Sequence, residues 1–185
     1  MKRKLKQLDA MEVAWRNCQQ CGLSLGRSKV VNWRGSPDAP LAIIGEPPGA
    51  DEDQQGLPYV GRSGRMLDGL LAQAGLKPST DVFIVNSVGC MPVGFRPSVS
   101  EFEACHPRIE YLISVVAPRA VLLLGPIALR FVDSQARQPE IEFTYKDVVS
   151  VYPAIASLAT LTEPRDADVL LSDIRKAWEL ARAKA

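Results

Sequence analysis

Four cysteines are the side chains of this sequence best suited to hold a metal: Cys18, Cys21, Cys90 and Cys105. Cys18 and Cys21 are separated by two residues, a spacing at which one turn presents both sulfurs to one metal centre. Cys90 and Cys105 are separated by fourteen residues. The four thiols therefore predict a metal or cluster site assembled from distant parts of the chain.

Three interpretations of these cysteines compete. A structural zinc site usually repeats the short spacing twice, whereas an iron–sulfur cluster accepts an irregular arrangement. Disulfides are disfavoured because a chain of this size does not need them and the basic first residues are not expected to form a secretion signal. On spacing alone, zinc and an iron–sulfur cluster remain equally open.

A rigid loop with nearby acids is the second candidate for chemistry. Residues 41–44 form an apolar run typical of a buried parallel strand, and they are followed directly by Gly45-Glu46-Pro47-Pro48-Gly49. The prolines and glycines predict a stiff turn. Glu52 follows in an acidic segment, and an amphipathic helix is expected up to about Gly75. This order places the loop at the carboxyl edge of a parallel sheet, where α/β folds bind ligands.

The other elements predict the scaffold that positions these residues. Further strands are expected at 81–86, 120–124 and 147–151, with 139–143 as an edge strand or loop. Helices are expected at 3–17, after a capping box formed by Ser98 and Glu101, at 127–132, and at 166–183. The alternation predicts an α/β fold, a three-layer α/β/α sandwich around a mostly parallel four-stranded sheet. A length of 185 residues predicts one domain, residues 1–185.

The same patterns assign side chains to core or surface. In the first helix, the expected buried positions are Leu5, Leu8, Val13 and Trp15. The helix after Ser98 carries Phe102, Cys105, Ile109, Leu112 and Ile113 at helical spacing. Four arginines lie near the loops of interest, and each taken singly is expected to be solvated surface: Arg62, Arg65, Arg96 and Arg108.

Composition and charge are those of an ordinary globular chain. Hydrophobic residues make up 46% and charged residues 23%, and the net charge of +1 neither demands nor excludes nucleic acid. No apolar run reaches the ~18–20 residues that crossing a membrane requires. We therefore expect a cytoplasmic monomer without a membrane partner.

Taken together, these features resemble the family 4 uracil-DNA glycosylases, the iron–sulfur branch of the uracil-DNA glycosylase superfamily. The resemblance covers about residues 18–132 and continues more weakly beyond them. Its matching features are the first cysteine pair, Gly45-Glu46-Pro47-Pro48-Gly49, Glu52-Asp53, the stretch Gly56-Leu57-Pro58-Tyr59-Val60-Gly61-Arg62-Ser63-Gly64, Asn86 four residues before Cys90, the loop to Cys105, and Leu123-Leu124-Gly125-Pro126. The resemblance implies that the four cysteines hold a [4Fe–4S] cluster and not zinc.

The resemblance also implies an activity. It predicts a monofunctional DNA-repair glycosylase that flips uracil, or a related deaminated base, out of DNA and hydrolyses its N-glycosidic bond, leaving an abasic site. Single- or double-stranded DNA is then the partner, and a replication or repair protein is a further candidate partner.

Within the resemblance, base recognition falls to four residues. Gly45 and Pro47 belong to the base-binding loop, Tyr59 supplies an aromatic face for stacking, and Asn86 has the donor and acceptor that fit one edge of uracil. The alternatives are a core aromatic for Tyr59 and an ordinary strand-end turn for Asn86.

Catalysis and DNA contacts fall to further residues. Glu46 and Glu52 are expected to orient the attacking water or to stabilise the cationic sugar, although Glu52 could also be a solvated loop carboxylate. Arg62, Ser63 and Gly64 open a helix and offer backbone N–H groups to a DNA phosphate. The alternative there is helix capping by Ser63.

Two positions depart from the family pattern. Its third motif is His-Pro followed by Ser or Ala, where the histidine donates to the uracil oxygen; here the matching residues are Tyr152, Pro153 and Ala154, the last two expected to contact DNA. Loss of one such donor typically costs ~10²–10³ in rate, so the phenol of Tyr152 would have to donate instead. Pro47 stands where the family has alanine and lacks a backbone N–H.

These departures leave alternatives to an active uracil enzyme. The sole histidine, His106, follows Cys105 and is expected near the cluster or at the surface. One alternative is a weakened or inactive glycosylase fold that binds DNA or a partner. Another is a glycosylase for a modified base.

Overall fold

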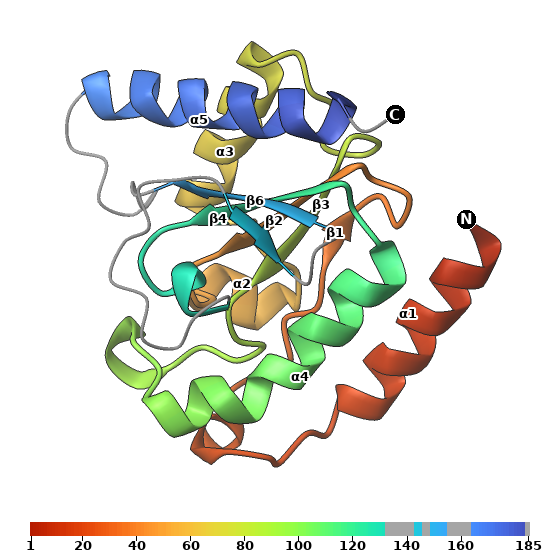
Figure 1. The fold of residues 1–185 in the computed structure, drawn as a ribbon. Helices are drawn as coiled ribbons and strands as arrows, with labels where there is room; N and C mark the ends of the chain where they lie inside the picture. The colour runs from red at the N-terminus through yellow and green to blue at the C-terminus, as the bar shows by residue number, and fades with distance from the viewer. Residues whose placement is uncertain (132–142, 146–148, 155–163, 184–185) are drawn as a thin grey trace.

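The protein contains a six-stranded sheet whose four central strands are parallel (Figure 1). The computed structural model describes residues 1–131, 143–145, 149–154 and 164–183. The parallel strands are β2 (Leu41–Gly45), β3 (Val82–Asn86), β4 (Ala120–Leu124) and β6 (Val149–Ala154). Two short antiparallel strands flank them, β1 (Arg34–Gly35) beside β3 and β5 (Phe143–Tyr145) beside β6, giving the order β1-β3-β2-β4-β6-β5.

The predicted α/β fold with its parallel strands is confirmed, but the sheet is wider than the four strands expected. β1 has only two residues, too few to show a periodic pattern in the sequence. The expected edge segment 139–143 corresponds in part to β5, and residues 139–142 lie outside the described residues. β6 continues past Val151 to Ala154, because Leu123 and Leu124 of β4 extend the pairing.

Helices cover both faces of the sheet and complete the three layers (Figure 1). On one face lie α1 (Lys2–Trp15) and α4 (Val99–Val116), and on the other α3 (Arg62–Gln73) and α5 (Pro164–Ala183). The connections contain α2 (Ala50–Gln55) and the 3₁₀ helices η1 (Gly22–Leu25), η2 (Val93–Phe95) and η3 (Ala128–Phe131). None of the helices in the described ranges combines the length and hydrophobicity needed to cross a membrane.

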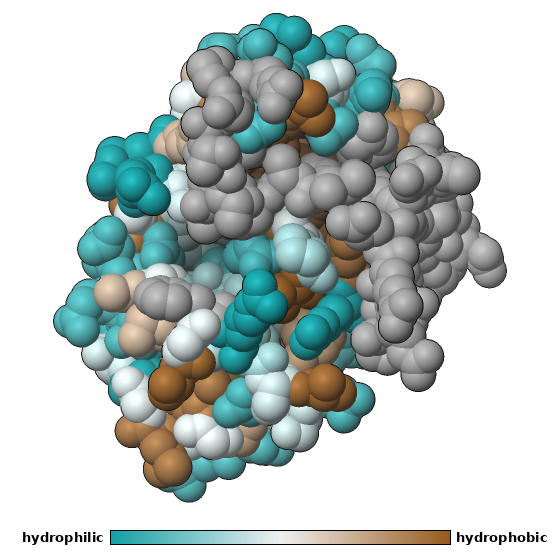
Figure 2. Space-filling model, turned by 90° about the vertical axis from the view of Figure 1, so that its left-hand side faces the viewer, coloured by the Kyte–Doolittle hydropathy of each residue, from teal (hydrophilic) through white to brown (hydrophobic). Residues whose placement is uncertain are grey.

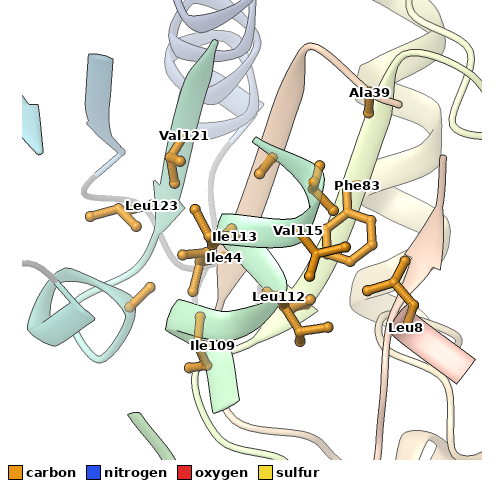
Figure 3. Close-up of a cluster of buried hydrophobic side chains, with 14 of the residues drawn as sticks. Leu8, Ala39, Ile44, Phe83, Ile109, Leu112, Ile113, Val115, Val121 and Leu123 are labelled. Atoms are coloured by element: carbon orange, nitrogen blue, oxygen red, sulfur yellow. The ribbon is translucent and has the colours of Figure 1, made fainter. Parts of the chain in front are cut away.

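Alternate side chains of the strands build a core on each face of the sheet. The core between the sheet and the helices α1 and α4 includes Leu8, Ile44, Phe83, Ile109, Leu112 and Leu123 (Figure 3). The core between the sheet and the helices α3 and α5 includes Ile43, Leu67, Leu71, Leu122, Leu170 and Ile174. Strands β2, β3 and β4 are buried at every position, which explains why they read as continuous apolar runs.

The buried face of α1 differs from the expected one at Val13. Leu8 and Met11 are buried and lie three residues apart on one face, whereas the side chain of Val13 is 66% exposed. Five residues along a helix from Leu8 lead to its opposite side, so Val13 faces solvent. Trp15 is partly buried against the same core, as expected.

The capping chemistry of two helices explains where they begin. The N–H of Glu101 donates to Ser98 Oγ, and the N–H of Ser98 donates to Glu101 Oε2, which confirms the capping box of α4. The helix α2 was not predicted, because it has only six residues and these are mostly polar. Asp51, Glu52 and Asp53 favour its first turn, and Gly56 ends it with φ 77°.

Candidate active site and four-cysteine site

The candidate active site lies where β2 and β3 end. Gly45 of β2 is paired in register with Asn86 of β3, and the N–H of Ser87 donates to the carbonyl of Gly45 at 2.7 Å. The turquoise helix η3, which follows β4, lies on the left of Figure 1, and Figure 2 turns this side toward the viewer. On that face, small groups of apolar residues alternate with hydrophilic ones. Because the loop begins where β2 ends beside β3, it lies at the carboxyl edge of the parallel strands, as predicted.

Glu46, the first residue after β2, has a largely buried carboxylate. Its Oε1 accepts a hydrogen bond from the N–H of Ile127 at 2.9 Å. Gly125 makes room for it: a Cβ on Gly125 would lie 2.4 Å from Oε1. Burial raises the pKa of Glu46 above its ordinary 4.5, although the amides of Ile127 and Ala128 partly oppose the rise. Such a carboxylate can accept or hold a proton above the usual range of a glutamate.

Asn86 is 3% exposed and is oriented by Glu46. Its Nδ2 donates to the backbone carbonyl of Glu46 at 2.7 Å. Its Oδ1 is buried and has no hydrogen-bond partner among the described residues. Buried polar atoms are seldom left unpaired, so this oxygen is suited to accept a hydrogen bond from a ligand.

Tyr59 is 7% exposed and packs against the end of β2. A Cβ on Gly45 would lie 1.6 Å from Tyr59 Oη, and a Cβ on Gly64 would lie 1.7 Å from the Tyr59 carbonyl oxygen. The ring also belongs to the core between the sheet and the helices α3 and α5, and burial raises the pKa of its phenol. Gly45 and Gly64, both expected to contact ligand, thus also provide the space that Tyr59 occupies.

Glu52 holds the loop that leads to Tyr59. It is 9% exposed, and its Oε1 accepts from the N–H groups of Val60 and Gly61, both at 2.9 Å. Its Oε2 accepts from the N–H of Gly49 at 3.1 Å. Both oxygens of the carboxylate therefore bind the backbone on either side of α2, so Glu52 is not a solvated loop carboxylate.

The proposed DNA-contact residues lie at the start of α3 and the end of β6. Arg62 is exposed and Ser63 half-buried; the helix begins after Gly61 without a side-chain cap, so Ser63 does not cap it. The backbone of Tyr152 pairs with Leu122 near the end of the parallel sheet. The side chains of Tyr152, Pro153 and Ala154 lie outside the described part of the structure. Pro47 is half-buried in the loop after Glu46.

All four cysteines line one cavity between the end of α1, the loop after β3 and α4. They are free thiols, and burial raises the pKa of Cys90 to about 11 and also raises that of Cys105. The N–H of Gly89 points at Cys105 Sγ at 3.2 Å, and Arg27 Nη1 lies 3.7 Å from Cys90 Sγ. N–H donors aimed at sulfur favour the thiolate form that metal binding requires.

The arrangement of the thiols bears on what they could hold. Within the described residues, no three His, Cys, Asp or Glu side chains converge closely enough to bind a single ion. Four thiols around one cavity suit instead a group that binds each thiolate at a different atom, as a [4Fe–4S] cluster does. His106 lies beside this site, with its ring 5.9 Å from that of Phe102, which packs in the same small core as Cys90.

The prediction that Arg108 lies at the surface is wrong. Its side chain is fully buried in the wall of the cysteine cavity, and its Nη2 donates to the carbonyls of Val31 and Asn32. The available signal was its position three residues after Cys105, on the same face of a helix. The contacts of Glu46 with Gly125 and Ile127 were also missed, since about eighty residues separate them from the loop.

Comparison with known proteins places the chain in a family. A family model described as the uracil DNA glycosylase superfamily matches residues 33–175. The type-4 uracil-DNA glycosylase of Saccharolobus solfataricus is 31% identical over 189 residues, covering 96% of this chain and 88% of the relative. That of Sulfurisphaera tokodaii is 29% identical, covering 89% and 80%. That of Pyrobaculum aerophilum is 38% identical, but covers only 62% of this chain and 59% of the relative. On these matches, the chain belongs to the uracil DNA glycosylase superfamily, as a relative of its type-4 members.

Proposed function

We propose that this protein is a monofunctional uracil-DNA glycosylase that excises uracil from DNA and leaves an abasic site. The observation that carries the proposal is the junction of Glu46 and Asn86 at the end of β2, in a chain of this superfamily. The similar proteins are named type-4 uracil-DNA glycosylases, and we infer the same substrate here. We further infer a single domain over residues 1–185, a monomer, a cytoplasmic location and DNA as partner, with a replication or repair protein as a second partner.

Base selection is assigned to Asn86. Its unpaired Oδ1 can accept a hydrogen bond from N3–H of uracil, and its second amide N–H can donate to O4. Cytosine has no N3–H and carries an amino group at position 4, so it would meet a mismatched contact at both atoms. A site that must hydrogen-bond its substrate rejects analogues that lack the matching group, because its buried polar atoms are left unpaired.

Tyr59 and its surroundings form the wall of the proposed pocket. An aromatic ring held rigidly at the end of β2 can stack on a flipped base at low entropic cost. Gly45 and Pro47 are assigned to the same wall, and the proline keeps the loop stiff. This packing is compatible with the ring serving both the core and the base.

Glu46 is assigned the chemical step. A carboxylate partly removed from water acts strongly on nearby charge, so it can stabilise the cationic sugar that develops as uracil leaves. It can also orient the water that attacks the sugar. Glu52 is assigned the positioning of the loop, because both of its oxygens are engaged by backbone N–H groups.

We infer that Cys18, Cys21, Cys90 and Cys105 bind a [4Fe–4S] cluster. The support is the single cavity that they line and the resemblance to the iron–sulfur branch of the superfamily. When bound, such a cluster supplies a rigid link among its ligands and a one-electron redox centre. The chain's part is to present four thiolates, which must lose their protons on binding.

Contacts to DNA are assigned to the start of α3 and to the end of β6. Arg62, with Ser63 and Gly64 at the start of α3, is assigned the binding of a phosphate through its charge and the helix N–H groups. Tyr152 is assigned the donation to the uracil oxygen, and Pro153 and Ala154 are assigned contacts to the DNA backbone.

An oligonucleotide assay tests the proposal. Anaerobically purified protein is incubated with single-stranded and duplex oligonucleotides that contain one uracil, and abasic sites are then cleaved with alkali. We expect cleavage at uracil, lost in Asn86→Ala and retained in the exposed control Asn17→Ala. Uncleaved oligonucleotide together with retained DNA binding would instead support a binding module, and cleavage at a modified base alone would support a different specificity.

A further inference from the structure

Arg108 of α4 is a fully buried arginine whose hydrogen-bonding groups are only partly used. Its Nη2 donates to the carbonyls of Val31 and Asn32, while Nε and Nη1 are buried without a partner among the residues described. A guanidinium stays charged at ordinary pH, and burying an unpaired charge is costly. The position therefore calls for an anionic acceptor near Nε and Nη1.

The groups near Arg108 that can carry negative charge are the cysteine sulfurs and Glu12. Arg108 lines the same cavity as the four cysteines. The backbone of Gly89 passes alongside: a Cβ on Gly89 would lie 3.3 Å from Arg108 Nε, and Cys90 follows directly. Cys105 lies one helical turn before Arg108. Glu12 also attracts the guanidinium, but Nε and Nη1 form no hydrogen bond with it.

We propose that Arg108 is a positioning residue of the iron–sulfur site, whose Nε and Nη1 donate to sulfur atoms of the bound cluster and its thiolate ligands. The inference rests on the proposed cluster and does not depend on which base is excised. A [4Fe–4S] cluster with four thiolate ligands carries net negative charge, so it supplies both the missing acceptors and the missing countercharge. Hydrogen bonds to sulfur are among the features that set the potential of such clusters.

The remaining contacts of Arg108 connect the cluster to the pocket. Its Nη2 holds the carbonyls of Val31 and Asn32. The N–H of Asn32 in turn donates to the carbonyl of Gly56, the residue that ends α2, at 3.1 Å. The guanidinium thus lies between the cluster cavity and the segment that precedes Tyr59.

Spectroscopy of the cluster in Arg108 variants tests the proposal. In Arg108→Gln, loss of a positive charge disfavours the more negative reduced cluster, so the midpoint potential should fall. We expect about a tenfold change in the one-electron equilibrium constant, about 59 mV. Release of iron to a chelator should become roughly 10–100-fold faster, because losing a partner of a metal ligand typically weakens metal affinity by that factor. Arg119→Gln, which removes an exposed arginine immediately before β4, should change neither quantity.

The outcomes separate the inference from its premise. Iron and sulfide analysis of the unmodified protein tests the cluster itself, and a protein without them overturns both proposals. A cluster with unchanged potential and unchanged iron release in Arg108→Gln overturns only the role of Arg108. If Arg108→Gln does not fold, Arg108→Lys decides. The compact ammonium lacks the extended fork of donors with which the guanidinium reaches the carbonyls on one side and the sulfurs on the other. Iron release must therefore accelerate, and an unchanged rate refutes the role.

Discussion

The hydroxyl of Tyr59 occupies the space that a side chain on Gly45 would need: a Cβ there would be 1.6 Å from Tyr59 Oη. Tyr59 itself has a left-handed backbone, with φ 55°, and its carbonyl leaves no room for a side chain on Gly64. The pocket aromatic is thus held between a glycine of β2 and a glycine of α3. Its position depends on the absence of two side chains as much as on its own contacts.

Gly45→Ala is expected to destabilise the protein by about 1–3 kcal/mol, because overpacking forces Tyr59 or β2 to move. Gly69→Ala in α3 is the control, since no atom lies within 4 Å of its added Cβ. Alanine in a helix interior should stabilise by roughly 0.5–1 kcal/mol there. Denaturant unfolding measures both changes. Equal stability of Gly45→Ala and the unmodified protein would mean that the ring adjusts without cost.

Glu46 is expected to make both activity and stability depend on pH. Burial raises its pKa above 4.5, so the folded state holds the proton more tightly than the unfolded state does. The free energy of unfolding should therefore fall as pH rises from 4.5 through the raised pKa, and Glu46→Gln should abolish this slope. Excision by the unmodified protein should instead rise over the same range, as the carboxylate forms.

Two measurements between pH 4 and pH 8, in steps of about half a unit, check these predictions for Glu46. Unfolding curves give the pH dependence of stability, and single-turnover assays give that of excision. Asp51→Asn is the control, because that carboxylate is exposed. An acid limb of excision that persists in Glu46→Gln would assign the titration to another group.

Glu52→Gln is expected to lower stability by about 1.5–3 kcal/mol, because an amide nitrogen replaces an oxygen that accepts from the backbone. Loss of activity should accompany the loss of stability, and both should be partly restored at lower temperature. Asp51→Asn on the same helix should change neither. If Glu52→Gln is as stable as the unmodified protein and yet inactive, Glu52 activates the water and the positioning role is wrong.

Tyr152→His is expected to raise the rate of uracil excision by up to ~10²–10³, the usual worth of a preorganised donor to a developing anion. Tyr152→Phe should lower the rate, because it removes the phenol to which we assign the donation. Single-turnover rates on a single-stranded uracil oligonucleotide measure both. An unchanged rate in both variants would place the donor to the uracil oxygen elsewhere.

Cys18→Ala is expected to remove the brown colour of the protein, with loss of an absorption band near ~400 nm. Removing one of four ligands should also lower the thermal midpoint, because ligand binding energy contributes to folding. The matched control is a change that spares the thiols, Ser24→Ala, beside the same cavity. A colourless protein with one zinc per chain would refute the cluster.

The sequence by itself determined the local elements. Continuous apolar runs gave β2, β3 and β4, since strands buried on both faces carry no polar alternation. Ser98 and Glu101 marked the start of α4, because a capping box is a contact between neighbours in the chain. The resemblance to a glycosylase family likewise rests on short stretches, such as the loop around Glu46, that can be compared residue by residue.

Only the tertiary structure decided which distant groups meet. Nothing near Glu46 in the chain indicates that its carboxylate is held by the N–H of Ile127, a contact made because β2 and β4 are adjacent. Arg108 reads as surface until α4 packs it against the cysteine cavity, where its charge needs a counterion. Side-chain burial and pKa follow from such long-range packing, and periodicity along one element carries no information about the element that will cover it.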